Sequence, residues 1–98
     1  MNKIRLPKRI NIFGQTIEIE LSDTIQDTED AEGLSLYRKN KIILNNYNRT
    51  DEQIENNFFH EIMHFVFCYL NENDLKDNEK LVHLIGAVLH QIFKTAEY

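Results

Sequence analysis

The sequence predicts an α+β fold, in which a small antiparallel sheet of two hairpins is followed by two antiparallel helices. In several short segments before residue 45, apolar and polar residues alternate with a period of two, which is typical of half-buried strands. After Thr50, apolar residues recur at helical spacing instead. A short polar connection at residues 71–74 divides this helical region, so the two helices are expected to lie side by side. With 98 residues, we expect a single domain over residues 1–98.

Two hairpins are expected in the N-terminal half. Residues 9–13 and 16–21 both alternate, and Gly14 lies in the turn between them. Residues 34–36 and 41–44 form the second pair, separated by a polar stretch that suits a tight turn.

The remaining segments are a loop and two helices. Ser22 to Gly33 is acidic and has neither period, so we expect an exposed loop. A first helix is expected from about Asp51 to Leu70, because Thr50 followed by Gln53 matches a capping box. A second helix is expected from Leu75 to about Thr95. The first helix is rich in aromatic residues, so the sheet must cover one side of it and the second helix another.

Charge and composition exclude several classes of protein. The formal net charge of −5, from 11 Lys and Arg against 16 Asp and Glu, argues against nucleic acid or an anionic membrane as a partner. No apolar run is long enough to cross a bilayer or to form the core of a signal peptide. Cys68 is the only cysteine, which fits a reducing cytoplasm. A basic cluster at the N-terminus is expected to be solvated: Lys3, Arg5, Lys8 and Arg9.

Two histidines lie in an unusually apolar part of the first helix. Residues 58–70 read FFHEIMHFVFCYL, in which His60, Glu61 and His64 are the main polar groups. Burying such groups without a partner costs about 1 to 3 kcal/mol each. Residues four apart project from the same face of a helix, so both imidazoles can reach one cation at zinc-ligand distance. The alternative is that both histidines are core residues satisfied by backbone or carboxylate groups without a metal.

Glu61 completes the H-E-x-x-H pattern of zinc peptidases. It is rotated from His60 by roughly 100° about the helix axis, so it borders the site without being aimed at the metal. Its expected role is general base toward a zinc-coordinated water, and then general acid toward the leaving amine. Zn²⁺ is the expected cofactor, although the same ligands also bind Mn²⁺ and Ni²⁺.

A catalytic zinc site needs a third protein ligand and an open fourth position. The candidates downstream are Asp74, Asp77, Glu79, His83 and His90. Glu79 is the first choice, because it lies about as far after the connection as His64 lies before it. His83 follows Glu79 by one turn, so it is expected either to be the ligand or to orient Glu79.

These residues resemble the ImmA/IrrE-type metallopeptidases, especially the short phage-borne versions. The resemblance rests on the strand-rich first part, the motif helix and a second helix that starts Asn78-Glu79-Lys80-Leu81-Val82, and it covers residues 34–93. It implies a minimal zincin-like fold with Glu79 as third zinc ligand, and a cytoplasmic peptidase that cleaves a regulator such as a phage or mobile-element repressor. Val82 and His83 stand where longer members usually have an Ala-Asn or Ala-Asp pair.

The wider zincin class holds its substrate as an added strand along a sheet edge. Residues 41–45 form the last strand before the motif helix, so we expect this edge there. An oxyanion donor is expected near the metal, and the sequence leaves four candidates open: Tyr37, Tyr47, His83 and His90. Cys68 is interpreted as a buried small hydrophobe.

The leading hypothesis is therefore a zinc metalloendopeptidase in which His60, His64 and Glu79 bind the metal and Glu61 is the catalytic base. One alternative is a non-catalytic, metal-containing module that captures a phage or host regulator. Another is a helical-hairpin domain without metal.

Overall fold

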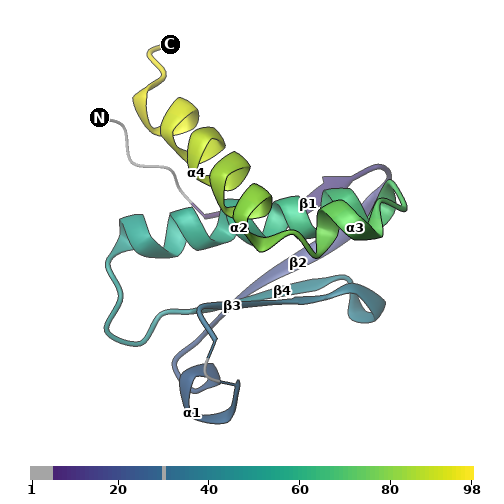
Figure 1. The fold of residues 1–98 in the computed structure, drawn as a ribbon. Coiled ribbons are helices and arrows are strands. Elements are labelled where there is room, and N and C mark those ends of the chain that lie inside the picture. Colours follow the sequence, from purple (N-terminus) through teal and green to yellow (C-terminus); the bar gives the residue numbers. More distant parts are fainter. Residues whose placement is uncertain (1–5, 30) are drawn as a thin grey trace.

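The computed structural model describes residues 6–29 and 31–98, so the basic residues Lys3 and Arg5, together with Asp30, lie outside the described part. As predicted, the fold is α+β: helix α2 lies across one face of a sheet, and α4 packs on the other side of α2 (Figure 1). In chain order the elements are β1 Arg9–Ile12, β2 Gln15–Ser22, α1 Ile25–Glu29, β3 Gly33–Leu36, the 3-10 turn Tyr37–Lys39, β4 Lys41–Asn45, α2 Asp51–Tyr69, α3 Asn73–Lys76 and α4 Glu79–Thr95.

Both predicted hairpins are present, but the sheet they form is mixed rather than antiparallel. β1 pairs antiparallel with β2, with Ile10 opposite Ile17, and β3 pairs antiparallel with β4. The hairpins join through a parallel pairing of β2 with β4, in which Ile19 lies opposite Ile42. A hairpin turn determines only the pairing of its own two strands, so the period-two pattern could not predict how the hairpins meet.

The strand order β1-β2-β4-β3 places β4 inside the sheet. The expectation that residues 41–45 form the sheet edge beside the motif helix is therefore wrong, and β3 occupies that edge. Ile42 and Leu44 are fully buried, so they serve the core. β4 is not an edge strand because β3, which precedes it in the chain, pairs with the edge of β4 that β2 leaves free.

The segment between the hairpins is also more ordered than predicted. The loop expected at residues 22–33 contains the short helix α1. Before this helix, Thr24 N donates a hydrogen bond to Oγ of Ser22, and Ile25 is only 6% exposed. A single anchoring apolar residue produces no periodicity, so the sequence pattern could not reveal this helix.

Helix α2 begins at the predicted capping box, in which the Thr50 side chain accepts from Gln53 N and the Gln53 side chain accepts from Thr50 N. The second predicted helix is broken into α3 and α4, so its expected start at Leu75 is wrong. The break occurs where Asn78 caps α4 by accepting a hydrogen bond from Leu81 N. Within the described residues, no helix combines the length and apolar character that a bilayer span requires.

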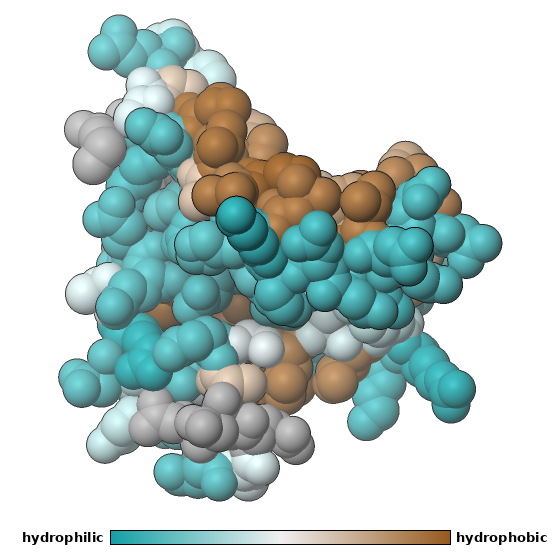
Figure 2. Space-filling view, viewed as in Figure 1, coloured by the Kyte–Doolittle hydropathy of each residue, from teal (hydrophilic) through white to brown (hydrophobic). Residues whose placement is uncertain are grey.

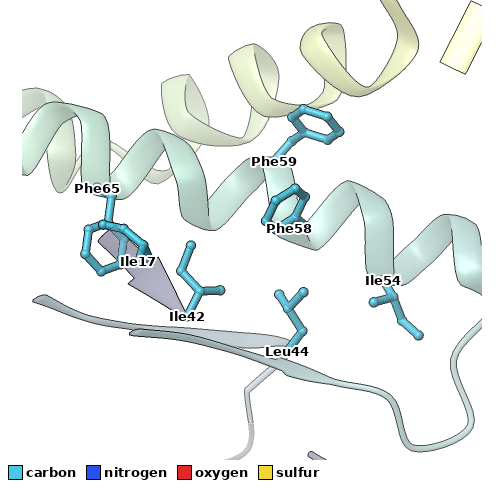
Figure 3. Close-up of a cluster of buried hydrophobic side chains, with 7 residues drawn as sticks. All are labelled: Ile17, Ile42, Leu44, Ile54, Phe58, Phe59 and Phe65. Carbon is cyan, nitrogen blue, oxygen red and sulfur yellow. The ribbon is translucent and has the colours of Figure 1, made fainter. Parts of the chain in front are cut away.

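The main core lies between α2 and the sheet (Figure 3). Its fully or nearly fully buried members are Ile17, Ile42, Leu44, Ile54, Phe58, Phe59 and Phe65. A second cluster of Met63, Phe67 and Val82 packs α2 against α4. Cys68 is only partly buried, so its interpretation as a buried residue holds in part. The motif helix is thus covered on two sides, as its aromatic content predicted.

Helices α2 and α4 run antiparallel, since Glu55 contacts Lys94 near one end and His64 contacts Glu79 near the other. They approach most closely at Gly86, where an added Cβ would lie 3.0 Å from both Cα and N of His60. The absent side chain lets the backbones touch at the first residue of the motif. The position of α4 relative to the histidines therefore depends on this glycine.

Candidate metal centre

The two motif histidines lie together on one face of α2. Their ring centroids are 5.0 Å apart, as expected for residues one helical turn apart. His64 is buried, whereas His60 retains partial exposure. Both rings face the N-terminal end of α4, where the antiparallel crossing brings the next polar group.

Glu79 is the first residue of α4, and it bridges the two histidines. Its Oε2 lies 3.1 Å from Nε2 of His60, and its Oε1 lies 3.1 Å from Nε2 of His64. One ligand atom from each of the three residues lies within 4.8 Å of the others. The side chain of Glu79 is 68% exposed, so the carboxylate reaches the imidazoles from the solvent side.

None of the other candidate ligands belongs to this three-residue group. His83 is exposed, and its ring centroid is 6.0 Å from that of His60, so it borders the group without joining it. Asp77 lines the same cleft. His90 is buried at the opposite end of the helix pair, with its Nε2 3.1 Å from Oε1 of Glu55. Asp74 is exposed in α3 and does not line this cleft.

Glu61 lies beside the three-residue group and is held by the edge strand. Its Oε2 is 4.0 Å from Nε2 of His60, and its Oε1 accepts a 2.7 Å hydrogen bond from the hydroxyl of Ser35. Only 7% of Glu61 is exposed. At Gly33, an added Cβ would lie 3.1 Å from Oε2 of Glu61, so the missing side chain makes room for the carboxylate.

These groups open onto a cleft of about 630 Å³. It is lined by Glu32, Gly33, Ser35, Tyr37, Asn57, His60, Glu61, His64, Lys76, Asp77, Glu79 and His83. Of the four candidate oxyanion donors, Tyr37 and His83 line the cleft, whereas Tyr47 and His90 do not. Burial, with smaller contributions from nearby acidic groups, raises the pKa of the Tyr37 phenol. The phenol therefore remains protonated and able to donate at neutral pH.

The three residues offer donor types that a divalent metal ion such as zinc accepts. Two imidazole nitrogens and one carboxylate also form the donor set of some catalytic zinc sites, and here the three ligand atoms lie within 4.8 Å of one another. The Nε2 atoms of His60 and His64 both lie against Glu79, so they are the ring nitrogens available to a metal ion. The buried Nδ1 of His64 has no hydrogen-bond partner among the described residues. The three residues lie beside an open cleft, which would leave a fourth position on such an ion free for water.

Sequence reasoning missed three residues that shape this site: Gly33, Ser35 and Gly86. A lone glycine within a helical pattern does indicate close packing, so Gly86 could have been found. Ser35 is 26 positions from Glu61, and no local pattern connects them.

Comparison of the sequence with protein-family models finds no match, and comparisons with curated proteins and with solved structures find none either. The arrangement of His60, Glu61, His64 and Glu79 is therefore the main indication of function.

Proposed function

We propose that this chain is a zinc-dependent metallopeptidase of the ImmA/IrrE type, with His60, His64 and Glu79 as metal ligands. The observation that carries the proposal is the convergence of three ligand atoms within 4.8 Å, beside a fourth, carboxylate-bearing residue of the same motif. Bound Zn²⁺ would supply Lewis-acid chemistry, activating water and polarising a peptide carbonyl.

Glu61 is the proposed general base and acid. Its Oε2 is the oxygen nearer the histidines, while Ser35 occupies Oε1. The free oxygen accepts a proton from water as the water oxygen attacks the carbonyl carbon. The same proton then passes to the amide nitrogen as the carbon–nitrogen bond breaks, so Glu61 ends as it began. Tyr37 is the proposed donor to the oxyanion, because its phenol lines the cleft and its raised pKa keeps it protonated.

The proposed substrate is an extended segment of a regulatory protein, such as a phage or mobile-element repressor. Support comes from β3, an edge strand whose Gly33 and Ser35 line the cleft. An edge strand can pair with an extended peptide backbone and so align it with the metal. The free thiol of Cys68 is consistent with work in a reducing cytoplasm, which is part of the same proposal.

The test compares the wild-type chain with Glu61→Gln. Each purified protein is loaded with zinc, its metal content is measured, and cleavage of a peptide library is followed by mass spectrometry. We expect one zinc per chain in both proteins, with cleavage slowed by roughly 10²-fold or more in the variant. Equal cleavage by both proteins would contradict the role of Glu61. Zinc binding without any cleavage would favour the non-catalytic binding module instead, and no zinc binding would exclude both.

A further inference from the structure

Helix α4 turns an uncharged, apolar face away from the rest of the molecule. Leu84, Val88 and Ile92 are 53%, 53% and 54% exposed, and they recur every four residues along one side of the helix. The opposite side carries the buried residues Val82 and Gly86 against α2. Leu81 and Ile85, both half-buried, flank the stripe. We call Leu81, Leu84, Ile85, Val88 and Ile92 the outer α4 face.

This face is unusual for a surface helix. Between Lys80 and Lys94, α4 contains no Asp, Glu, Lys or Arg. Hydrophobic side chains gather over α4 and continue toward the end of α2 in Figure 2. A solvated helix normally carries charges on the side opposite its core, so an apolar stripe there indicates a binding surface.

We propose that the outer α4 face binds the same face of a second copy of this chain, with the two α4 helices antiparallel across a two-fold axis near Val88. The stripe is symmetric about Val88, so Leu84 of one copy would meet the partner's Ile92, and the reverse. Such an isologous contact closes on itself and gives a dimer rather than a filament. This inference is independent of the proposed peptidase activity.

The charges at the two ends of the face favour a second copy in this orientation. Lys80 lies at the N-terminal end of the face, whereas the neighbouring Glu79 is directed to the other side of the helix, toward His60 and His64. The exposed Glu97 lies just beyond the C-terminal end. Antiparallel pairing brings each lysine toward the partner's glutamate, whereas parallel pairing would bring lysine to lysine. Antiparallel helix dipoles add to this preference. Lys94 does not enter the contact, because its ammonium group is bound to Glu55.

The size of the face predicts a weak dimer. Three half-exposed aliphatic side chains with two flanking ones leave on the order of 300 Å² of apolar surface. A standard interface buries about 800 Å² per partner, of which just over half is apolar. The outer α4 face is therefore at the small end of specific interfaces, and association should depend on concentration.

Sedimentation equilibrium tests the proposal over roughly 10 to 300 μM protein. We expect the wild-type mass to rise from 11.7 kDa toward twice that value, and Val88→Glu to stay at the mass of one chain. The matched control is Tyr47→Glu, which alters a side chain of nearly the same exposure, 54% against 53% for Val88, away from α4; this variant should dimerise like the wild type. Circular dichroism verifies that each variant is folded. A wild-type chain that stays monomeric, or a dimer that Val88→Glu leaves intact, overturns the proposal.

Cysteine cross-linking tests the orientation, in a Cys68→Ser background that leaves no other thiol. Val88→Cys should cross-link to itself under mild oxidation, because this residue lies next to the axis. Leu84→Cys alone should not, but a mixture with Ile92→Cys should give the mixed dimer. Self-cross-linking at both positions 84 and 92 would indicate parallel helices and overturn the antiparallel arrangement.

Discussion

The hydroxyl of Ser35 donates a 2.7 Å hydrogen bond to Oε1 of Glu61, which links the edge strand β3 to the motif helix. Two residues earlier on the same face of β3, Gly33 leaves the space that the carboxylate fills. One strand therefore both orients Glu61 and makes room for it. The Oε2 atom is left beside His60, where the proposed proton transfer would take place.

The Ser35–Glu61 contact can be measured with a double-mutant cycle in metal-free protein. Ser35→Ala should lower the free energy of unfolding by about 1 to 3 kcal/mol, because a buried carboxylate loses a donor. In a Glu61→Gln background the same change should cost less, since the charge is gone. Ser35→Thr, which keeps the hydroxyl, is the control in urea unfolding. Equal losses in both backgrounds would show that the two side chains are not coupled.

Zinc affinity should separate Glu79 from His83. Glu79→Gln removes the carboxylate that contacts both histidines, so we expect affinity to fall by more than about 100-fold. His83→Gln alters a neighbouring exposed ring, and its effect should stay below about 10-fold. Competition with a chromophoric chelator measures both. The reverse ranking would make His83 the third ligand.

Gly86→Ala tests the close crossing of the two helices. The new Cβ would lie 3.0 Å from backbone atoms of His60, which cannot move aside as a flexible side chain would. Overpacking costs about 1 to 3 kcal/mol, while alanine gains up to about 1 kcal/mol in helix propensity. We expect a net loss of unfolding free energy together with weaker zinc binding, because α4 carries Glu79. Gln91→Ala, at an exposed position of the same helix, is the control and should change neither.

Lowering the pH should remove the contribution of the Arg49–Glu32 ion pair to the free energy of unfolding. Hydrogen bonds from Arg49 lower the pKa of Glu32 below its usual 4.5. The stabilisation is therefore present above about pH 4.5 and is lost as pH falls through the lowered pKa. Glu32 is 53% exposed, so Glu32→Gln should cost under about 1 kcal/mol at pH 7 and nothing at a pH well below the lowered pKa. Urea unfolding at both pH values measures the difference. A cost that is unchanged at low pH would contradict this assignment.

At the end of the α2–α4 pair away from Glu79, Glu55 is only 1% exposed, and its Oε1 accepts a 3.0 Å hydrogen bond from Nζ of Lys94. The same Oε1 lies 3.1 Å from Nε2 of His90. Glu55→Ala leaves these groups without their partner, so we expect a loss of about 3 to 5 kcal/mol in thermal or urea unfolding. Glu52→Ala, an exposed change in the same helix, should cost far less. Zinc affinity at pH 7 should be unchanged where the variant is folded, because this cluster lies away from His60.

Local patterns predicted much of the candidate site. Two histidines one turn apart must share a face of any helix, so their proximity could be inferred from His60 and His64 alone. The short connection that makes the helices antiparallel also favours Glu79, which lies about as far after it as His64 lies before it, but this reasoning leaves His83 open as an alternative. The break between α3 and α4 at residues 77–78 does not change the position of Glu79, because Asn78 caps α4 and Glu79 is the first residue of that helix.

The sequence by itself determined the strands, the capped motif helix and the shared face of its two imidazoles, because each follows from periodicity or from spacing along one helix. The tertiary structure decided that Glu79 rather than His83 contacts both imidazoles. Tertiary structure alone decided that β2 and β4 pair in parallel, that β3 rather than β4 forms the edge beside the cleft, and that Ser35 holds Glu61. These relationships join segments far apart in the chain. They depend on how whole faces pack together, and no local pattern contains that information.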